Sequence, residues 1–146
     1  MNTESNVNVR VTRQFSVSPE KVFDAWLDPE MIGKWMFGPD LRDEEVVRIS
    51  LDPRVGGSFS FVVRRQGQEI DHVGEYLKMD RPRRLVFTWG VADVEGSSRV
   101  MIDIVPLKNG SELTLTHELH SDWADFAGRT KDAWTKMLDV LAEKLS

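Results

Sequence analysis

The sequence has no cysteine, one tyrosine and three histidines among its 146 residues. The absence of cysteine excludes disulfide bonds, thiolate nucleophiles and thiolate metal sites, and it is compatible with a reducing compartment. The sequence has no G-x-S-x-G motif, which would indicate a serine hydrolase. It also has no glycine-rich loop with a lysine, which would indicate a phosphate-binding site. The sequence therefore names no reaction through a short motif.

Long apolar runs and an excess of positive charge are also absent. No stretch approaches the roughly 20 apolar residues that a membrane helix requires, and the start, MNTESNVNVR, lacks the pattern of a secretory signal. The net charge of −5 opposes nucleic acid as a partner, because phosphate binding needs a cationic surface. The basic cluster at residues 81–84 contains Pro82 and is expected to form a solvated turn. We expect a cytoplasmic protein that neither binds nucleic acid nor inserts into a membrane.

The chain length suits one domain, which we expect to cover residues 7–145 after a flexible N-terminus at residues 1–6. Residues 7–15, VNVRVTRQF, alternate apolar and polar side chains and predict a strand. Helical spacing follows, with proline directly after Ser18 and Asp28, which are both good N-cap residues. This pattern predicts two short helices.

Six further strands are predicted between residues 46 and 119, where apolar side chains recur at every second position. Turn-forming residues such as Gln66-Gly67 and Asn109-Gly110 separate them, and such short links join antiparallel neighbours. The predicted strands are residues 46–51, 56–65, 69–79, 83–90, 98–107 and 111–119. From Asp122 the spacing becomes helical again and predicts a long C-terminal helix.

This order of elements, β-α-α-β6-α, predicts an α+β fold. A long antiparallel sheet and a long amphipathic helix bury their apolar faces together when the sheet curves around the helix. We expect a curved seven-stranded sheet wrapped around the C-terminal helix, with the two short helices closing one end. A sheet curved in this way tends to leave a gap between itself and the helix.

The element order resembles that of the START-like superfamily (SRPBCC), which has the birch-pollen-allergen-like helix-grip fold. Spaced segments, in the same order, resemble the family related to the activator of heat-shock-protein-90 ATPase (AHSA-type). The similar segments are SPEKVFDAWLDPEMIGKWMFGP, RVGGSFSF, GEYLKMDRPRRLVFTW, ELTLTHE and AWTKMLDVLAEKL. They cover nearly the whole chain, about residues 7–145, and in this family's pattern Gly56 and Gly57 look structural.

The resemblance implies a fold and a cavity and leaves three functions open. Members bind hydrophobic small molecules, some relatives are enzymes of polyketide and aromatic metabolism, and the name-giving eukaryotic domain acts on a chaperone. We expect the first function, with a lipid, polyketide or flavonoid-like ligand held between the sheet and the C-terminal helix. The alternatives are acid–base catalysis in the same cavity and a chaperone-cofactor-like interaction. We expect a monomer or weak homodimer with no cofactor and no metal.

The stretch TLTHELH, residues 114–120, contains two of the three histidines. A zinc protease helix has H-E-x-x-H, whereas the spacing here is one residue shorter and follows a strand pattern. On a continuous strand His117 shares a face with Leu113 and Leu115, and His120 points the other way, so the pair does not hold one metal ion. His117 is predicted to line the interior, hydrogen-bonded to a neighbour or orienting a polar group of a ligand.

His72 and Tyr76 share one face of a predicted strand. Both faces of that strand have apolar residues, so the alternation leaves open whether this pair points into the cavity or into solvent. If acid–base chemistry takes place, His72, Tyr76 and His117 are the candidates for it.

Aromatic residues are the most informative group, with five tryptophans and seven phenylalanines. They fit a well-filled core, and they also fit a pocket with apolar walls and a few polar anchors. The predicted cavity residues are Trp35, Phe37, Phe59, Phe61, His72, Tyr76, Phe87, Trp89, Ile102, His117, Trp134, Met137, Leu138 and Leu141.

Overall fold

A seven-stranded antiparallel sheet in the order β1-β7-β6-β5-β4-β3-β2 forms the frame of the protein. The computed structural model describes residues 7–37, 41, 44–92, 94, 98–119 and 125–145. The predicted flexible N-terminus and His120 lie outside these residues. The strands are β1 (Val7–Phe15), β2 (Glu45–Leu51), β3 (Ser58–Arg65), β4 (Gln68–Asp80), β5 (Arg84–Val91), β6 (Ser98–Leu107) and β7 (Gly110–Leu119). The predicted sheet of seven strands is confirmed.

Two short helices, α1 (Pro19–Ala25) and α2 (Pro29–Trp35), follow β1. Each begins with proline, which lacks the amide hydrogen that a first helical turn leaves unpaired. The Ser18 and Asp28 side chains cap the two helices by accepting backbone hydrogen bonds from residues of the first turn. The predicted helix pair is therefore confirmed, and its local sequence accounts for both helix starts.

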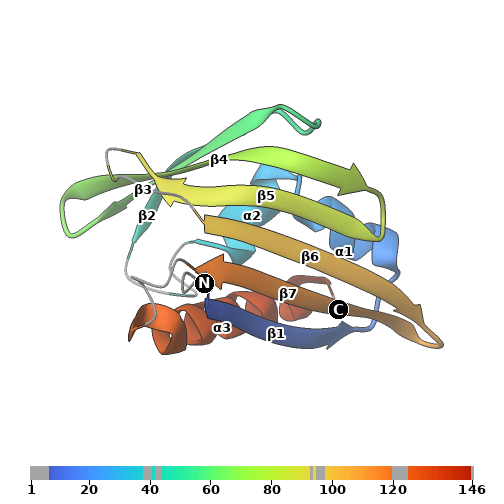
Figure 1. Cartoon of the computed structure of the whole chain (residues 1–146). Helices are drawn as coiled ribbons and strands as arrows, with labels where there is room; N and C mark the ends of the chain where they lie inside the picture. Colours follow the sequence, from blue (N-terminus) through green and yellow to red (C-terminus); the bar gives the residue numbers. More distant parts are fainter. Residues whose placement is uncertain are drawn as a thin grey trace, which may run out of the picture.

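The C-terminal helix α3 (Ala127–Leu145) lies along the inner face of the sheet, with its backbone closest to β1 (Figure 1). Its buried side chains recur every three or four residues and form one inward stripe: Trp134, Met137, Leu138 and Leu141. α1 and α2 lie on the same side of the sheet as α3. This arrangement confirms the predicted helix-grip architecture, with all helices on one side of the sheet.

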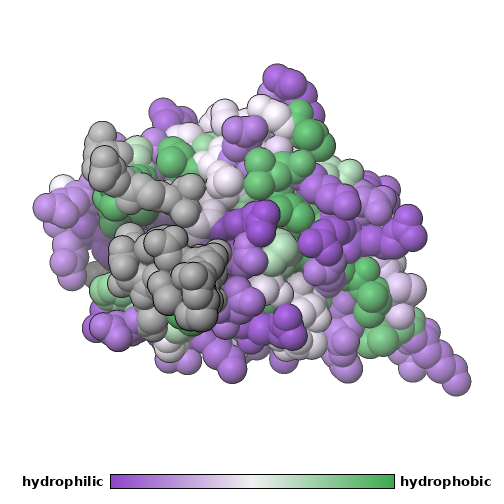
Figure 2. All heavy atoms as spheres, viewed as in Figure 1, coloured by the Kyte–Doolittle hydropathy of each residue, from purple (hydrophilic) through white to green (hydrophobic). Residues whose placement is uncertain are grey.

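The outer face of the sheet has polar and charged side chains in cross-strand pairs. Arg99 faces Glu118 across β6 and β7, and Arg84 faces Asp103 across β5 and β6 at 2.9 Å. Figure 2 shows this side of the molecule as mainly hydrophilic, with small groups of apolar side chains between charged ones. None of the helices in the described residues is both long and apolar enough to cross a membrane.

Gly74 on β4 lets the Phe59 ring lie close against the backbone of the sheet. It faces Phe59 on the neighbouring strand β3. A methyl group on Gly74 would collide with the Phe59 ring and with the backbone oxygen of Thr88. The ring of Phe59 therefore lies directly over a position where only a hydrogen atom fits.

We expect Gly74→Ala to lower the free energy of unfolding by about 1–3 kcal/mol, because the added methyl group overpacks a filled interior. Gly128→Ala is the matched control, since Gly128 lies in α3 with open space around it. That substitution is expected to raise stability by about 0.5 kcal/mol through the lower flexibility of alanine in the unfolded chain. Urea unfolding of both variants measures the difference, and equal effects would contradict the close approach at Gly74.

Candidate functional site

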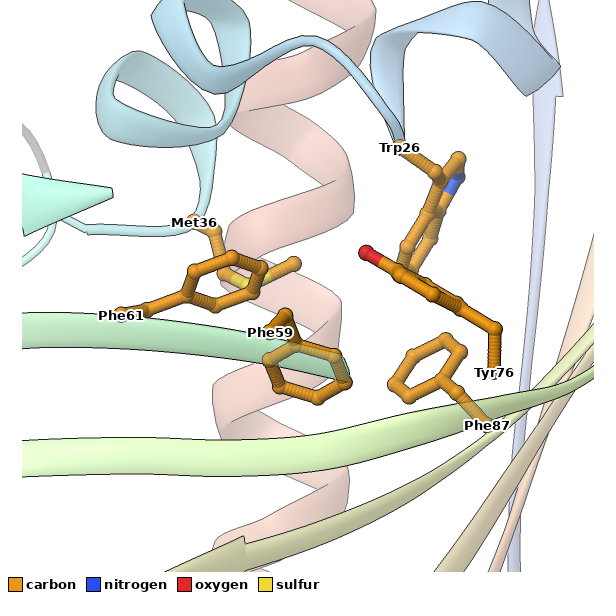
Figure 3. Close-up of a pocket in the computed structure, with 6 residues that line it drawn as sticks. All are labelled: Trp26, Met36, Phe59, Phe61, Tyr76 and Phe87. Atoms are coloured by element: carbon orange, nitrogen blue, oxygen red, sulfur yellow. The ribbon is translucent and has the colours of Figure 1, made fainter. Parts of the chain in front are cut away.

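A small cavity lies between the sheet and the helices, beneath the residues that follow α1 and α2. Its volume is about 10 Å³, which is close to the least that holds one water molecule. Six side chains line it: Trp26, Met36, Phe59, Phe61, Tyr76 and Phe87 (Figure 3). Five of the six are aromatic, and the sixth is methionine.

Tyr76 supplies the hydroxyl group of this cavity, and its backbone is held on both sides. The Gly56 amide donates to the Tyr76 carbonyl oxygen, and the Tyr76 amide donates to the Gly57 carbonyl oxygen, both at 2.9 Å. Gly56 has φ of +87°, a conformation that glycine adopts without strain. The two glycines thus place a turn against β4 beside Tyr76, which is the structural role that the family's pattern implied.

The Tyr76 hydroxyl points into the cavity (Figure 3), and the residue is only 2% exposed. Among the residues that the structure describes, none forms a hydrogen bond with this hydroxyl. Burial, with a further contribution from the Asp52 carboxylate, raises the pKa of the hydroxyl well above its usual range. The group is therefore protonated at neutral pH and able to donate.

Trp26 and Met36 form the helix-side wall of the cavity. The Trp26 ring contacts Trp35 edge-on, with centroids 4.5 Å apart. Its indole nitrogen is buried without an acceptor among the described residues, and in Figure 3 it lies at the end of the ring away from Tyr76. Met36 directly follows α2 and is 1% exposed. A buried donor without an acceptor costs stability.

A row of rings connects the cavity to the partly exposed side of the interior. Phe59 lies 5.5 Å from Tyr76, and Trp89 lies 5.9 Å from Phe59. His72 follows at 5.4 Å from Trp89 and 4.9 Å from Phe37. Trp89 and His72 are half-buried, whereas Tyr76 and Phe59 are buried. The question left open for His72 is answered, because its ring lies among the inner aromatic residues.

His117 on β7 is buried and forms two hydrogen bonds, one with α3 and one with the neighbouring strand β6. The Trp134 indole donates to His117 Nδ1 at 3.0 Å, and His117 Nε2 lies 2.6 Å from Ser98 Oγ. An indole nitrogen can only donate, so Nδ1 accepts and Nε2 bears the hydrogen. Ser98 in turn donates to the backbone oxygen of Trp89 at 3.1 Å. Burial lowers the pKa of His117 to about 4.

This chain of hydrogen bonds excludes one reading of the Ser98–His117 contact. A serine nucleophile needs a histidine whose nearer nitrogen accepts the hydroxyl proton. His117 instead presents the hydrogen of Nε2 to Ser98, because its other nitrogen is occupied by Trp134. The histidine is a neutral bridge between helix and sheet, as in the simpler of the two roles predicted for it.

Of the predicted cavity residues, four line the cavity itself: Phe59, Phe61, Tyr76 and Phe87. Two others of the predicted set, Trp89 and His72, are half-buried. The remaining eight are buried in the surrounding core: Trp35, Phe37, Ile102, His117, Trp134, Met137, Leu138 and Leu141. Two lining residues, Trp26 and Met36, were not in that set. Their helical spacing predicts burial, but no sequence signal specifies which wall a buried side chain joins.

The three acid–base candidates do not form one constellation. Within the described part of the chain, no hydrogen bond or ring contact joins any two of His72, Tyr76 and His117. His72 Nδ1 lies 3.1 Å from the backbone oxygen of Phe61, and a carbonyl oxygen can only accept, so this nitrogen donates. No group of three potential metal ligands is found among the described residues.

We expect the protein to lose stability between pH 6.5 and pH 4 through His117. Its folded pKa of about 4 lies below the unfolded value of 6.5, so in this range the unfolded chain binds more protons. The stabilising contribution is complete above pH 6.5 and falls by about 3 kcal/mol as the pH drops to 4. His117→Asn, which has no titrating ring, removes this part of the slope. Urea unfolding at several pH values measures it, and equal slopes in both proteins would contradict the assignment.

Comparisons with known proteins agree with this fold. Similar solved structures include a protein from Chromobacterium violaceum, with a TM-score of 0.81, 26% identity, and coverage of 94% of this chain and 96% of that one. Another, from Rhodobacter sphaeroides, has a TM-score of 0.83, 20% identity and coverage of 94% and 91%. A third, from Rhizobium loti, has a TM-score of 0.81, 22% identity and coverage of 99% and 100%. A search of curated protein sequences gave no match.

The family pattern described as "Activator of Hsp90 ATPase homolog 1-like protein" matches residues 16–146. That range runs from the end of β1 to the end of α3 and includes all six residues that line the cavity. The chain therefore belongs to the family of Activator of Hsp90 ATPase homolog 1-like proteins, within the START-like superfamily.

Proposed function

We propose that this protein binds a hydrophobic, aromatic small molecule in the space between the sheet and the helices. The observation that supports the proposal is the continuous row of rings from half-buried His72 and Trp89 to the cavity beside Tyr76. A planar ligand gains favourable offset or edge-to-face contacts with such rings. The fold of this family typically binds hydrophobic ligands, which is a second reason for the proposal.

The small cavity must enlarge for a ligand to enter, because small-molecule sites are typically about 300–1,000 Å³. Met36 is the flexible member of the lining, with an unbranched side chain that adopts many rotamers. It lies between α2 and the segment leading to β2, on the helix side of the cavity. We propose that the ligand's ring replaces the Met36 side chain.

The two alternative functions have less support from the described residues. Acid–base catalysis needs a base with an orienting partner beside the substrate, and the cavity lining has a single hydroxyl, that of Tyr76. A protein-interaction role favours a contiguous exposed apolar patch. Most of the exposed large apolar side chains among the described residues lie on different segments, and two of them, Val105 and Leu107, are neighbours on one face of β6. The full set is Val47, Val55, Leu77, Val94, Val105, Leu107 and Phe126.

A nitrogen–proton NMR titration with ethylbenzene tests the binding function. The five tryptophan indoles are separate reporters. Trp26 lies in the cavity wall, and Trp89 lies in the row of rings that leads to it. We expect saturable shifts that are largest for the Trp26 indole. No saturable shift with ethylbenzene or with larger aromatic compounds would contradict the proposal.

We expect Met36→Ala to bind ethylbenzene at least about tenfold more tightly than the unmodified protein, because the cost of opening the space is removed. The same substitution is expected to lower the free energy of unfolding by about 2–5 kcal/mol. Met137→Ala is the matched control, since Met137 is also a buried methionine but does not line the cavity. Similar gains in affinity in both variants would show that binding does not depend on this cavity.

A further inference from the structure

The Tyr76 hydroxyl specifies the chemical class of the ligand. Resting on the proposed binding function, we infer that the ligand is a neutral aromatic molecule with a hydrogen-bond acceptor, such as a ketone or aldehyde oxygen. Tyr76 donates a hydrogen bond to that oxygen while the rings of Phe59, Phe61 and Phe87 surround the aromatic part.

The hydroxyl is held in the cavity by its own residue. Both backbone hydrogen-bonding groups of Tyr76 are occupied by the turn at Gly56 and Gly57. The ring contacts Phe59 at 5.5 Å and Phe87 at 6.3 Å, and the hydroxyl points between Trp26 and Met36 (Figure 3). The donor therefore keeps its position when Met36 moves, and it faces the volume that Met36 vacates.

A buried hydroxyl normally has a hydrogen-bond partner. Among the described residues none provides one for the Tyr76 hydroxyl, which faces the cavity although the residue as a whole is 2% exposed. A phenol that stays protonated donates, and the adjoining indole of Trp26 can only donate. The Tyr76 hydroxyl can donate one hydrogen bond and can also accept, and the Trp26 indole adds a second donor to the lining. An acceptor on the ligand is the complement to the proton of the hydroxyl.

The lining also selects against an anionic ligand. None of the six lining residues is charged. The ionised group that acts on Tyr76 is the Asp52 carboxylate, which is half-buried and paired with Arg54 at 2.7 Å. A carboxylate ligand would lose its hydration without gaining a cation, which strongly disfavours its burial.

Three single-ring compounds of similar shape separate these features: acetophenone, ethylbenzene and benzoate. Acetophenone has a carbonyl oxygen that only accepts, ethylbenzene has no polar group, and benzoate is an anion. Each is titrated into the unmodified protein and into Tyr76→Phe. The same titrations are repeated with Met36→Ala added to both proteins, so that the cost of enlarging the cavity does not hide weak binding. Tyr76→Phe removes one oxygen atom that has no partner among the described residues, so its fold is expected to persist.

We expect Tyr76→Phe to weaken acetophenone binding by about three- to tenfold and to leave ethylbenzene within about twofold, because only the ketone loses a hydrogen bond. Benzoate is expected to bind more weakly than acetophenone in every variant. Tyr76 is the single tyrosine of the chain, so carbon-13 labelling of its ring carbon next to the hydroxyl gives one NMR signal. That signal is expected to shift with acetophenone and to shift much less with ethylbenzene.

The results distinguish failure of the inference from failure of the proposed function. Binding of ethylbenzene together with an unchanged acetophenone affinity in Tyr76→Phe would overturn the inference and leave the binding function intact. Benzoate binding as tight as that of acetophenone would also overturn it. No binding of any of the three compounds, in either the unmodified or the Met36→Ala protein, would overturn both.

Discussion

The interior of this protein is governed by a mismatch between a curved sheet and a straight helix. Seven antiparallel strands present an inner face that α3, with 19 residues, covers most closely along β1. α2 packs near β2 and α1 near β6 and β7, and large rings fill the interior over β3, β4 and β5. Aromatic side chains bridge such distances better than aliphatic ones because each buries a large surface. The ring row and the cavity at its end are consequences of this geometry.

Two polar side chains in the interior, His117 and Tyr76, differ in whether they have hydrogen-bond partners. His117 has both ring nitrogens paired, one with Trp134 on α3 and the other with Ser98 on β6. It stabilises the contact between helix and sheet through these two bonds. Tyr76 is buried to the same degree, yet its hydroxyl has no partner among the described residues. Satisfied groups are expected of a structural core, whereas a hydroxyl that faces a cavity is available to a ligand.

Much of the fold could be predicted from the sequence because its signals are local. Proline after Ser18 and Asp28 defines two helix starts, and alternation defines the strands. His117 could be placed on the inner face because Leu113 and Leu115 share its side of β7. His72 could not be placed in this way, because apolar residues occupy both faces of β4 and only the contacts with Phe37 and Trp89 decide its side.

The candidate site was harder to predict because it depends on contacts between distant elements. Tyr76 lies next to a register shift in β4 and is fixed by a turn some 20 residues earlier, at Gly56 and Gly57. Helical spacing shows that Trp26 and Met36 are buried, but their meeting with Tyr76 depends on how α1 and α2 dock against the sheet. The volume of the cavity is a property of all six side chains together, and no single residue indicates it.

The central claim is that a ligand's acceptor oxygen meets the Tyr76 hydroxyl inside the ring-lined space. A crystal structure of the Met36→Ala protein with acetophenone tests this most directly. The account predicts the aromatic ring in the volume left by Met36, with the carbonyl oxygen about 3 Å from the Tyr76 hydroxyl oxygen. Acetophenone on the outer surface, or inside with its oxygen directed away from Tyr76, would contradict it.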